Sequence, residues 1–67
     1  MAKRVIAIDP GYDRIGIAIF SGEHLQHSEC FVPDTKEFSE RLRAIAKRIQ
    51  ELTLEFSPEG LAMETLF

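Results

Sequence analysis

Residues 3–22 read KRVIAIDPGYDRIGIAIFSG, and this segment determines most of the expected architecture. Two apolar runs, Val5–Ile8 and Ile15–Phe20, are rich in β-branched residues and flank a short segment containing proline and glycine. β-Branched residues favour strands, whereas proline and glycine favour turns. Because each run is continuously apolar rather than alternating, it predicts a central strand that is covered on both faces. We therefore expect strands over residues 3–9 and 14–21, joined by a turn.

The rest of the chain predicts a third strand, a helix and a fourth strand. A two-residue turn signal at Gly22 and Glu23 precedes a polar, alternating segment over residues 24–32, which predicts a hairpin strand at the sheet edge. Apolar residues then recur at steps of three and four from Phe38 to Phe56, which predicts a helix whose apolar stripe packs on the core. Pro58 ends this helix. Residues 60–64 read as a short apolar strand that ends in an acid.

Two local patterns give further expectations. Alternation along the third strand places Leu25, His27, Glu29 and Phe31 on one face. Asp34, followed three residues later by Glu37, resembles a capping box for the helix, with Thr35 as the alternative cap.

Composition excludes several classes of protein. The chain has 67 residues, a net charge of −3 and one cysteine, Cys30. A lone cysteine excludes an internal disulfide, fits a reducing cytoplasm, and is most often a small buried hydrophobe. We find no apolar run of about 20 residues and no signal peptide, so a membrane span is not expected. The helix cations Arg41, Arg43, Lys47 and Arg48 lie among the acids Glu40, Glu51 and Glu55 and are interpreted as a solvated helix face, so the chain lacks the basic excess typical of nucleic-acid binding.

The predicted topology brings two acids together. A meander of three antiparallel strands followed by a helical crossover gives the strand order 3-2-1-4. Asp9 and Glu64 then end neighbouring parallel strands, whose backbones lie about 4.8 Å apart. Two carboxylates so close together repel unless a proton or a cation lies between them, and Mg²⁺ prefers such oxygens. The sequence therefore predicts a metal site at this edge of the sheet.

A single helix leaves the predicted sheet incomplete. One face of the sheet is bare, and the fourth strand is an exposed edge. We therefore expect residues 1–67 to be the N-terminal part of a single domain, truncated after its fourth strand.

Three segments carry a resemblance to a known family: Ile8–Gly11, Arg14–Gly16 and, after the helix, Met63–Phe67. Together they resemble the RuvC-type Holliday-junction resolvases over Val5 to Phe67. The resemblance implies a ribonuclease H-like α/β fold. It also implies a homodimer that hydrolyses phosphodiester bonds at four-way DNA junctions in recombination and repair, using Mg²⁺ with Mn²⁺ as a substitute.

The resemblance also implies roles for individual residues. Asp9 and Glu64 match the catalytic, metal-binding acids of the first and fourth strands. DNA contacts are implied for Phe67, Gly11, Gly16 and Arg14. The family carries two further acids on a late helix, and a dimer-forming helix after the position of Phe67, and this chain has neither. We therefore expect the 67-residue chain to be inactive alone.

Each of these residues also has a purely structural interpretation. Asp9–Gly11 is compatible with a simple turn, Gly16 with a β-bulge, and Glu64 with a solvated strand end. Phe67 reads equally well as a core aromatic, and Arg14 as a surface arginine.

Three other functions compete with junction resolution. The first is a YqgF-type nuclease of the same fold, suggested by Arg14–Ala18. The second is an actin-like ATPase or sugar kinase fragment, although small hydroxyl residues do not follow the glycine turn here. The third is a non-catalytic module that pairs with another protein through its open sheet edge.

Overall fold

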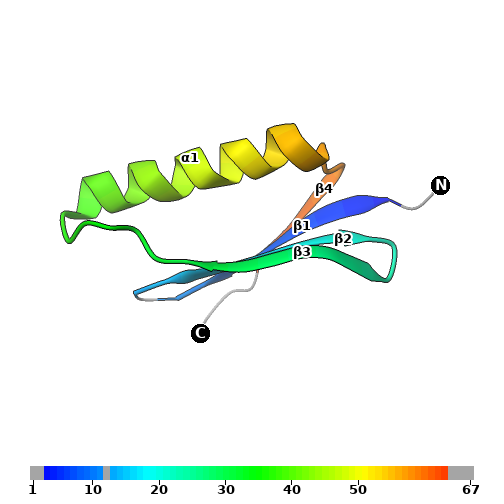
Figure 1. Ribbon diagram of the computed structural model, residues 1–67, viewed down its shortest axis with the longest axis horizontal. Helices are drawn as coiled ribbons and strands as arrows, with labels where there is room; N and C mark the ends of the chain where they lie inside the picture. Colours follow the sequence, from blue (N-terminus) through cyan, green and yellow to red (C-terminus); the bar gives the residue numbers. More distant parts are fainter. Residues whose placement is uncertain (1–2, 12, 64–67) are drawn as a thin grey trace.

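The structure is a computed structural model that describes residues 3–11 and 13–63. They form one four-stranded sheet with a helix across one face (Figure 1). The elements are β1 (Arg4–Pro10), β2 (Ile15–Ser21), β3 (His24–Phe31), α1 (Phe38–Phe56) and β4 (Gly60–Met63). The strand order is β3-β2-β1-β4, in which β1 pairs antiparallel with β2 and parallel with β4. This confirms the predicted mixed sheet of order 3-2-1-4, which is the opening of a ribonuclease H-like fold.

The predicted boundaries agree with the structure to within one residue. β1 extends one residue further than expected because Pro10 pairs with Ile15. β3 ends at Phe31, one residue earlier than expected. The expected last residue of the fourth strand, Glu64, lies outside the described residues.

The hydrophobic core lies between the sheet and α1. It consists of alternate residues of the two central strands and one helix residue: Ile6, Ile8, Ile15, Ile17, Ile19 and Leu52. Ile45, Ile49 and Phe56 pack against this cluster and are partly buried. The middle and the end of the apolar helix stripe therefore pack on the core as predicted.

The opposite face of the sheet carries the intervening residues, and no described element covers it (Figure 1). This agrees with the prediction of one bare face. Cys30 pairs with Gly16 on this face and is exposed, so the expectation of a buried cysteine was wrong. The sequence predicts cover on both faces of β1 and β2. Within the described part of the chain, α1 covers one of these faces.

A register shift in the β2–β3 pair changes the predicted faces. Ile19 pairs with His27, but Phe20 pairs with Leu25, so β3 holds one extra residue at this point. Because a bulge interrupts the two-residue alternation, Leu25 shares a face with Phe20 instead of with His27. The predicted common face is confirmed for His27, Glu29 and Phe31 and was wrong for Leu25. Gly16 lies in regular pairing and is not the site of a bulge.

The helix begins later than a capping box at Asp34 requires. The N-cap is Glu37, whose carboxylate accepts hydrogen bonds from the backbone N–H groups of Ser39 at 3.2 Å and Glu40 at 2.9 Å. Hydrogen bonds from the Ser39 hydroxyl and from these two N–H groups lower the pKa of Glu37. Thr35, the alternative cap, instead donates its hydroxyl to the carboxylate of Glu40 at 3.0 Å. The capping prediction was wrong because α1 begins only at Phe38.

The other end of the helix agrees with prediction. Ser57 adopts the left-handed conformation with a φ of 49°, and its N–H donates to the Thr53 carbonyl at 2.9 Å, immediately before Pro58. Within the residues that the structure describes, no helix has the length and apolarity needed to cross a membrane.

Candidate active site

The candidate site lies where β1 ends. Ile8 is buried against α1, so the next residue, Asp9, faces the uncovered side of the sheet, and it is exposed. Asp9 pairs with Gly16 of β2, and a Cβ at residue 16 would lie 3.5 Å from the Asp9 Cβ, an ordinary contact distance. Gly16 is thus not required to avoid a clash. Its effect is to leave the space beside the Asp9 carboxylate free of a neighbouring side chain.

Gly11 has a strict steric role in the turn that follows. A Cβ at this position would lie 2.5 Å from the backbone oxygen of Arg14, closer than such atoms approach. The turn therefore closes only with glycine here. The Arg14 side chain is exposed and makes no hydrogen bond or ion pair with any described residue, so its guanidinium is free to meet a ligand.

The turn is held to the helix by Arg41. Its guanidinium donates to the backbone oxygen of Asp13 at 3.0 Å and to that of Thr35 at 3.1 Å. These two bonds connect α1 with the β1–β2 turn and with the segment before the helix. Sequence reasoning missed this role because it placed Arg41 on a solvated helix face.

The structure brings together four of the six predicted site residues. Asp9, Gly11, Arg14 and Gly16 lie at one end of the β1–β2 pair. Glu64 and Phe67 lie outside the described residues. Across residues 3–11 and 13–63, no three His, Cys, Asp or Glu side chains form a group that could hold a metal ion. Asp9 nonetheless offers a free carboxylate, the hard oxygen donor that fits Mg²⁺.

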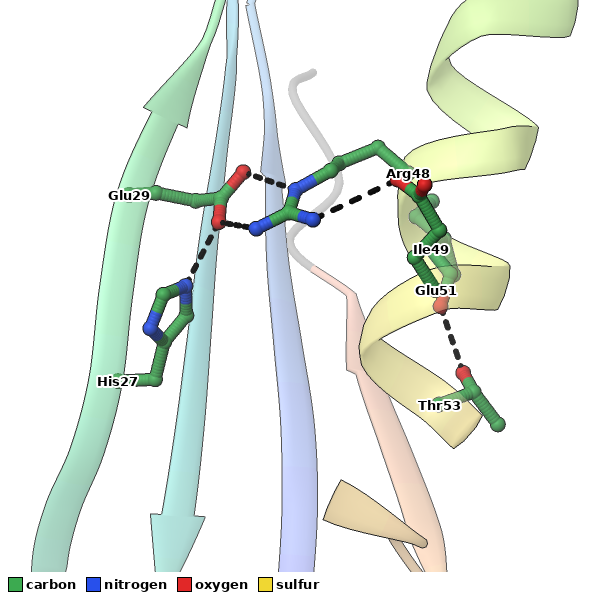
Figure 2. Close-up of polar contacts among 6 residues, drawn as sticks. All are labelled: His27, Glu29, Arg48, Ile49, Glu51 and Thr53. Atoms are coloured by element: carbon green, nitrogen blue, oxygen red, sulfur yellow. Dashed lines mark hydrogen bonds and ion pairs between the residues drawn. The ribbon is translucent and has the colours of Figure 1, made fainter. Parts of the chain in front are cut away.

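A second polar cluster connects β3 with α1 (Figure 2). Arg48 donates to both carboxylate oxygens of Glu29, from Nε to Oε2 at 2.8 Å and from Nη2 to Oε1 at 2.6 Å. The Nε2 atom of His27 lies 2.6 Å from the same Oε1. Glu51 accepts a longer hydrogen bond, 3.4 Å, from Nη1 of Arg48. The geometry is a bidentate pair with every Glu29 oxygen engaged.

The electrostatics of this cluster indicate a structural role. The hydrogen bond from Arg48 is the largest of the effects that lower the pKa of Glu29 to about 2; burial opposes it, and His27 adds to it. The same contact raises the pKa of Arg48. Since the Glu29 carboxylate already has strong partners, it is unavailable to a ligand. The prediction of a solvated Arg48 was wrong, and the signal that could have revealed this was the predicted alternation that placed Glu29 on the same face as His27.

Comparison with known proteins identifies a matching family and several similar proteins. The chain matches the family described as Crossover junction endodeoxyribonuclease RuvC over residues 5–67. It is 39% identical to the protein of that name from Methylococcus capsulatus and 35% identical to the one from Thermotoga maritima, each over 96% of this chain and 41% of the relative. The protein of the same name from Citrifermentans bemidjiense is 31% identical over 94% of this chain and 42% of its own length. No solved structure matches the chain.

These matches cover nearly the whole of this chain but only part of each relative. The chain spans about two fifths of the length of the curated relatives that it matches. The family match covers all five secondary-structure elements except the first residue of β1. The chain therefore belongs to the RuvC family of crossover junction endodeoxyribonucleases.

Proposed function

We propose that this chain forms the N-terminal part of a single ribonuclease H-like nuclease domain that resolves four-way DNA junctions in recombination and repair. The main observation behind this proposal is the position of Asp9. Its carboxylate is exposed near the end of β1, which is paired with β4. Family membership supports this reaction over the YqgF-type and ATPase alternatives. In the complete protein, we propose that a homodimer binds the junction.

The RuvC family depends on a metal, and the donor chemistry of Asp9 fits Mg²⁺, with Mn²⁺ as a substitute. We propose Asp9 and Glu64 as ligands. The register supports this pairing, because Ile8 lies opposite Met63 in the β1–β4 pair. Asp9 directly follows Ile8 in the sequence, and Glu64 directly follows Met63. A bound Mg²⁺ supplies Lewis-acid stabilisation of the charge that develops when a phosphodiester bond is hydrolysed.

The neighbouring residues then have distinct roles toward DNA. Arg14 donates charge-assisted hydrogen bonds to a phosphate oxygen, which fixes the strand beside Asp9. The turn at Gly11 and the bare backbone at Gly16 allow phosphate to approach closely. Phe67 stacks on an unpaired base at the junction.

A cleavage assay on a synthetic four-way junction tests this function. The protein from the complete reading frame is compared with its Asp9→Asn and Glu23→Gln variants in MgCl₂. We expect Asp9→Asn to lower the cleavage rate at least about 100-fold, since a lost metal ligand removes several kcal/mol of transition-state stabilisation. Glu23→Gln is the matched control, because Glu23 is an exposed acid in the β2–β3 turn, at the opposite end of β2 from Asp9. Equal cleavage by both variants and the wild type would refute the proposed role.

The 67-residue chain alone is proposed to be inactive. The chain carries Asp9 and Glu64, which are two of the four metal-binding acids that the resemblance implies, so half of the metal ligands are missing from this chain. We expect no Mg²⁺-dependent nicking of the junction by the purified chain. Nicking that Asp9→Asn abolishes would contradict this part of the proposal.

A further inference from the structure

A groove of about 730 Å³ is lined by residues from the first half of α1 and from the β1–β2 turn. In Figure 1, the start of α1 lies at the left-hand end of the molecule. The volume of the groove falls within the roughly 300–1,000 Å³ typical of ligand sites. Pro10 and Gly11 contribute to its lining, so it begins immediately after Asp9. The groove is thus next to the candidate metal ligand but is distinct from it.

The apolar lining of the groove is exposed to solvent. Phe38 and Leu42, from the start of α1, are 72% and 51% exposed, although both belong to the helix stripe that the sequence predicts to pack on the core. This prediction was wrong for the first half of the stripe. The other apolar lining residues are less accessible: Ile15 and Pro33 are buried, and Pro10 and Ile45 are partly buried. The ring of Phe38 is therefore accessible to a ligand at the surface of the groove.

The charged lining is predominantly positive. Arg14 and Lys36 make no hydrogen bond or ion pair among residues 3–11 and 13–63, and Arg41 keeps its positive charge while it donates to two carbonyl oxygens. Among the residues that the structure describes, Asp13 is the one acid that lines the groove. This local excess of positive charge contrasts with the net charge of −3 of the whole chain. The groove therefore combines an exposed aromatic ring with uncompensated cations.

We propose that this groove binds an unpaired nucleotide of a DNA strand, with the base against Phe38 and the phosphate beside Arg14 and Lys36. Nucleotide binding needs both features, because any base stacks on an aromatic ring and each phosphate contact releases condensed counterions. An apolar peptide would use the ring but would leave the two cations without partners. The inference rests on the proposed function. The groove would bind one nucleotide of the DNA strand, and the next phosphate along that strand would lie at Asp9.

Binding of a fluorescein-labelled oligo-dT 12-mer, followed by fluorescence anisotropy in EDTA, tests the groove without any metal chemistry. The protein from the complete reading frame is compared with Phe38→Ala, Phe38→Leu and Lys36→Gln. We expect Phe38→Ala to weaken binding about 5- to 100-fold, as for a lost base stack. Phe38→Leu, which keeps an apolar side chain on the helix, should retain the fold and still weaken binding. Lys36→Gln should reduce the steepness of the logarithmic salt dependence by about 0.7.

Two matched controls lie on the same helix but outside the groove. Leu54 is 76% exposed, so Leu54→Ala removes an equally accessible apolar side chain. Arg43 is exposed and does not line the groove, so Arg43→Gln removes a comparable charge. Both controls should bind the oligonucleotide within about twofold of the wild type.

The outcomes separate this inference from the proposed function. Equal losses in Phe38→Ala and Leu54→Ala would overturn the subsite, as would a wild-type protein that cleaves junctions yet does not bind oligo-dT. If Phe38→Ala instead abolishes self-association measured by sedimentation and leaves DNA binding unchanged, the groove is a protein interface and the inference fails. Junction cleavage that requires Asp9 would leave the proposed function intact in all of these cases.

Discussion

Replacing Glu29 with Gln removes the charge in the β3–α1 cluster while keeping the size of the side chain. The Glu29 pKa is lowered from 4.5 to about 2, chiefly by the hydrogen bond from Arg48, with burial opposing the shift and His27 adding to it. A lowered pKa means that the charged carboxylate favours the folded state. Its contribution to stability is therefore complete above pH 4.5 and is lost as the pH falls toward 2.

The size of this contribution follows from the shift. At about 1.36 kcal/mol per pKa unit, the ceiling is about 3 kcal/mol. The side chain of Glu29 is 19% exposed and that of Arg48 is 29% exposed, so solvent screening reduces the expected value to about 1–2 kcal/mol. We expect Glu29→Gln to lower the free energy of unfolding by this amount at pH 7. Near pH 2, the variant and the wild type should have similar stability.

Urea unfolding followed by far-UV circular dichroism at pH 7, 5, 4 and 2.5 measures this difference. Glu51→Gln is the matched control, because Glu51 contacts the same Arg48 at 3.4 Å but has a side chain that is 51% exposed. We expect this control to stay within about 0.5 kcal/mol of the wild type. If Glu29→Gln equals the wild type at pH 7, the reasoning is refuted. It is also refuted if the loss persists unchanged at pH 2.5, since packing rather than charge would then be responsible.

Two further predictions concern packing and the turn. Leu52 of α1 is completely buried against the sheet, so Leu52→Ala should lower the free energy of unfolding by about 2–5 kcal/mol. Leu54→Ala should change it by less than about 0.5 kcal/mol in the same urea titration. Because Gly11→Ala brings a Cβ within 2.5 Å of the Arg14 backbone oxygen, this variant should have a lower melting temperature than the wild type when measured by calorimetry. Gly16→Ala, with its nearest contact at 3.5 Å, should be tolerated, and the opposite order would contradict the steric argument.

The sheet could be predicted from sequence because its signals are local and redundant. Continuous β-branched runs, a turn between them and a helix of regular period leave one compact strand order, which the structure confirms. The bulge in β3, opposite Ile19 and Phe20 of β2, could not be predicted in this way. It depends on how β3 fits its neighbour along the whole pair, and nothing in residues 24–31 marks the extra residue.

The polar contacts of α1 were harder to predict than its position. The pattern of charges on the helix surface is the same whether Arg48 points to solvent or reaches Glu29 across the sheet. Long side chains select their partners by tertiary proximity, and sequence spacing along one helix does not contain this information. For Phe38 the error is in the opposite direction. Its spacing along the helix is that of a core residue, but it lies at the start of α1 and is 72% exposed.

The arrangement of β1 separates the candidate chemistry from the forces that hold the fold. Ile6 and Ile8 point into the core beneath α1, while Asp9 faces the uncovered side of the sheet and is exposed. An exposed carboxylate outside the core contributes little to packing, so Asp9→Asn should leave the free energy of unfolding within about 0.5 kcal/mol of the wild type. Unfolding and junction cleavage measured on one preparation of this variant are therefore expected to diverge. Parallel losses of both would show that Asp9 supports the structure, and the metal-ligand role would then lose its principal support.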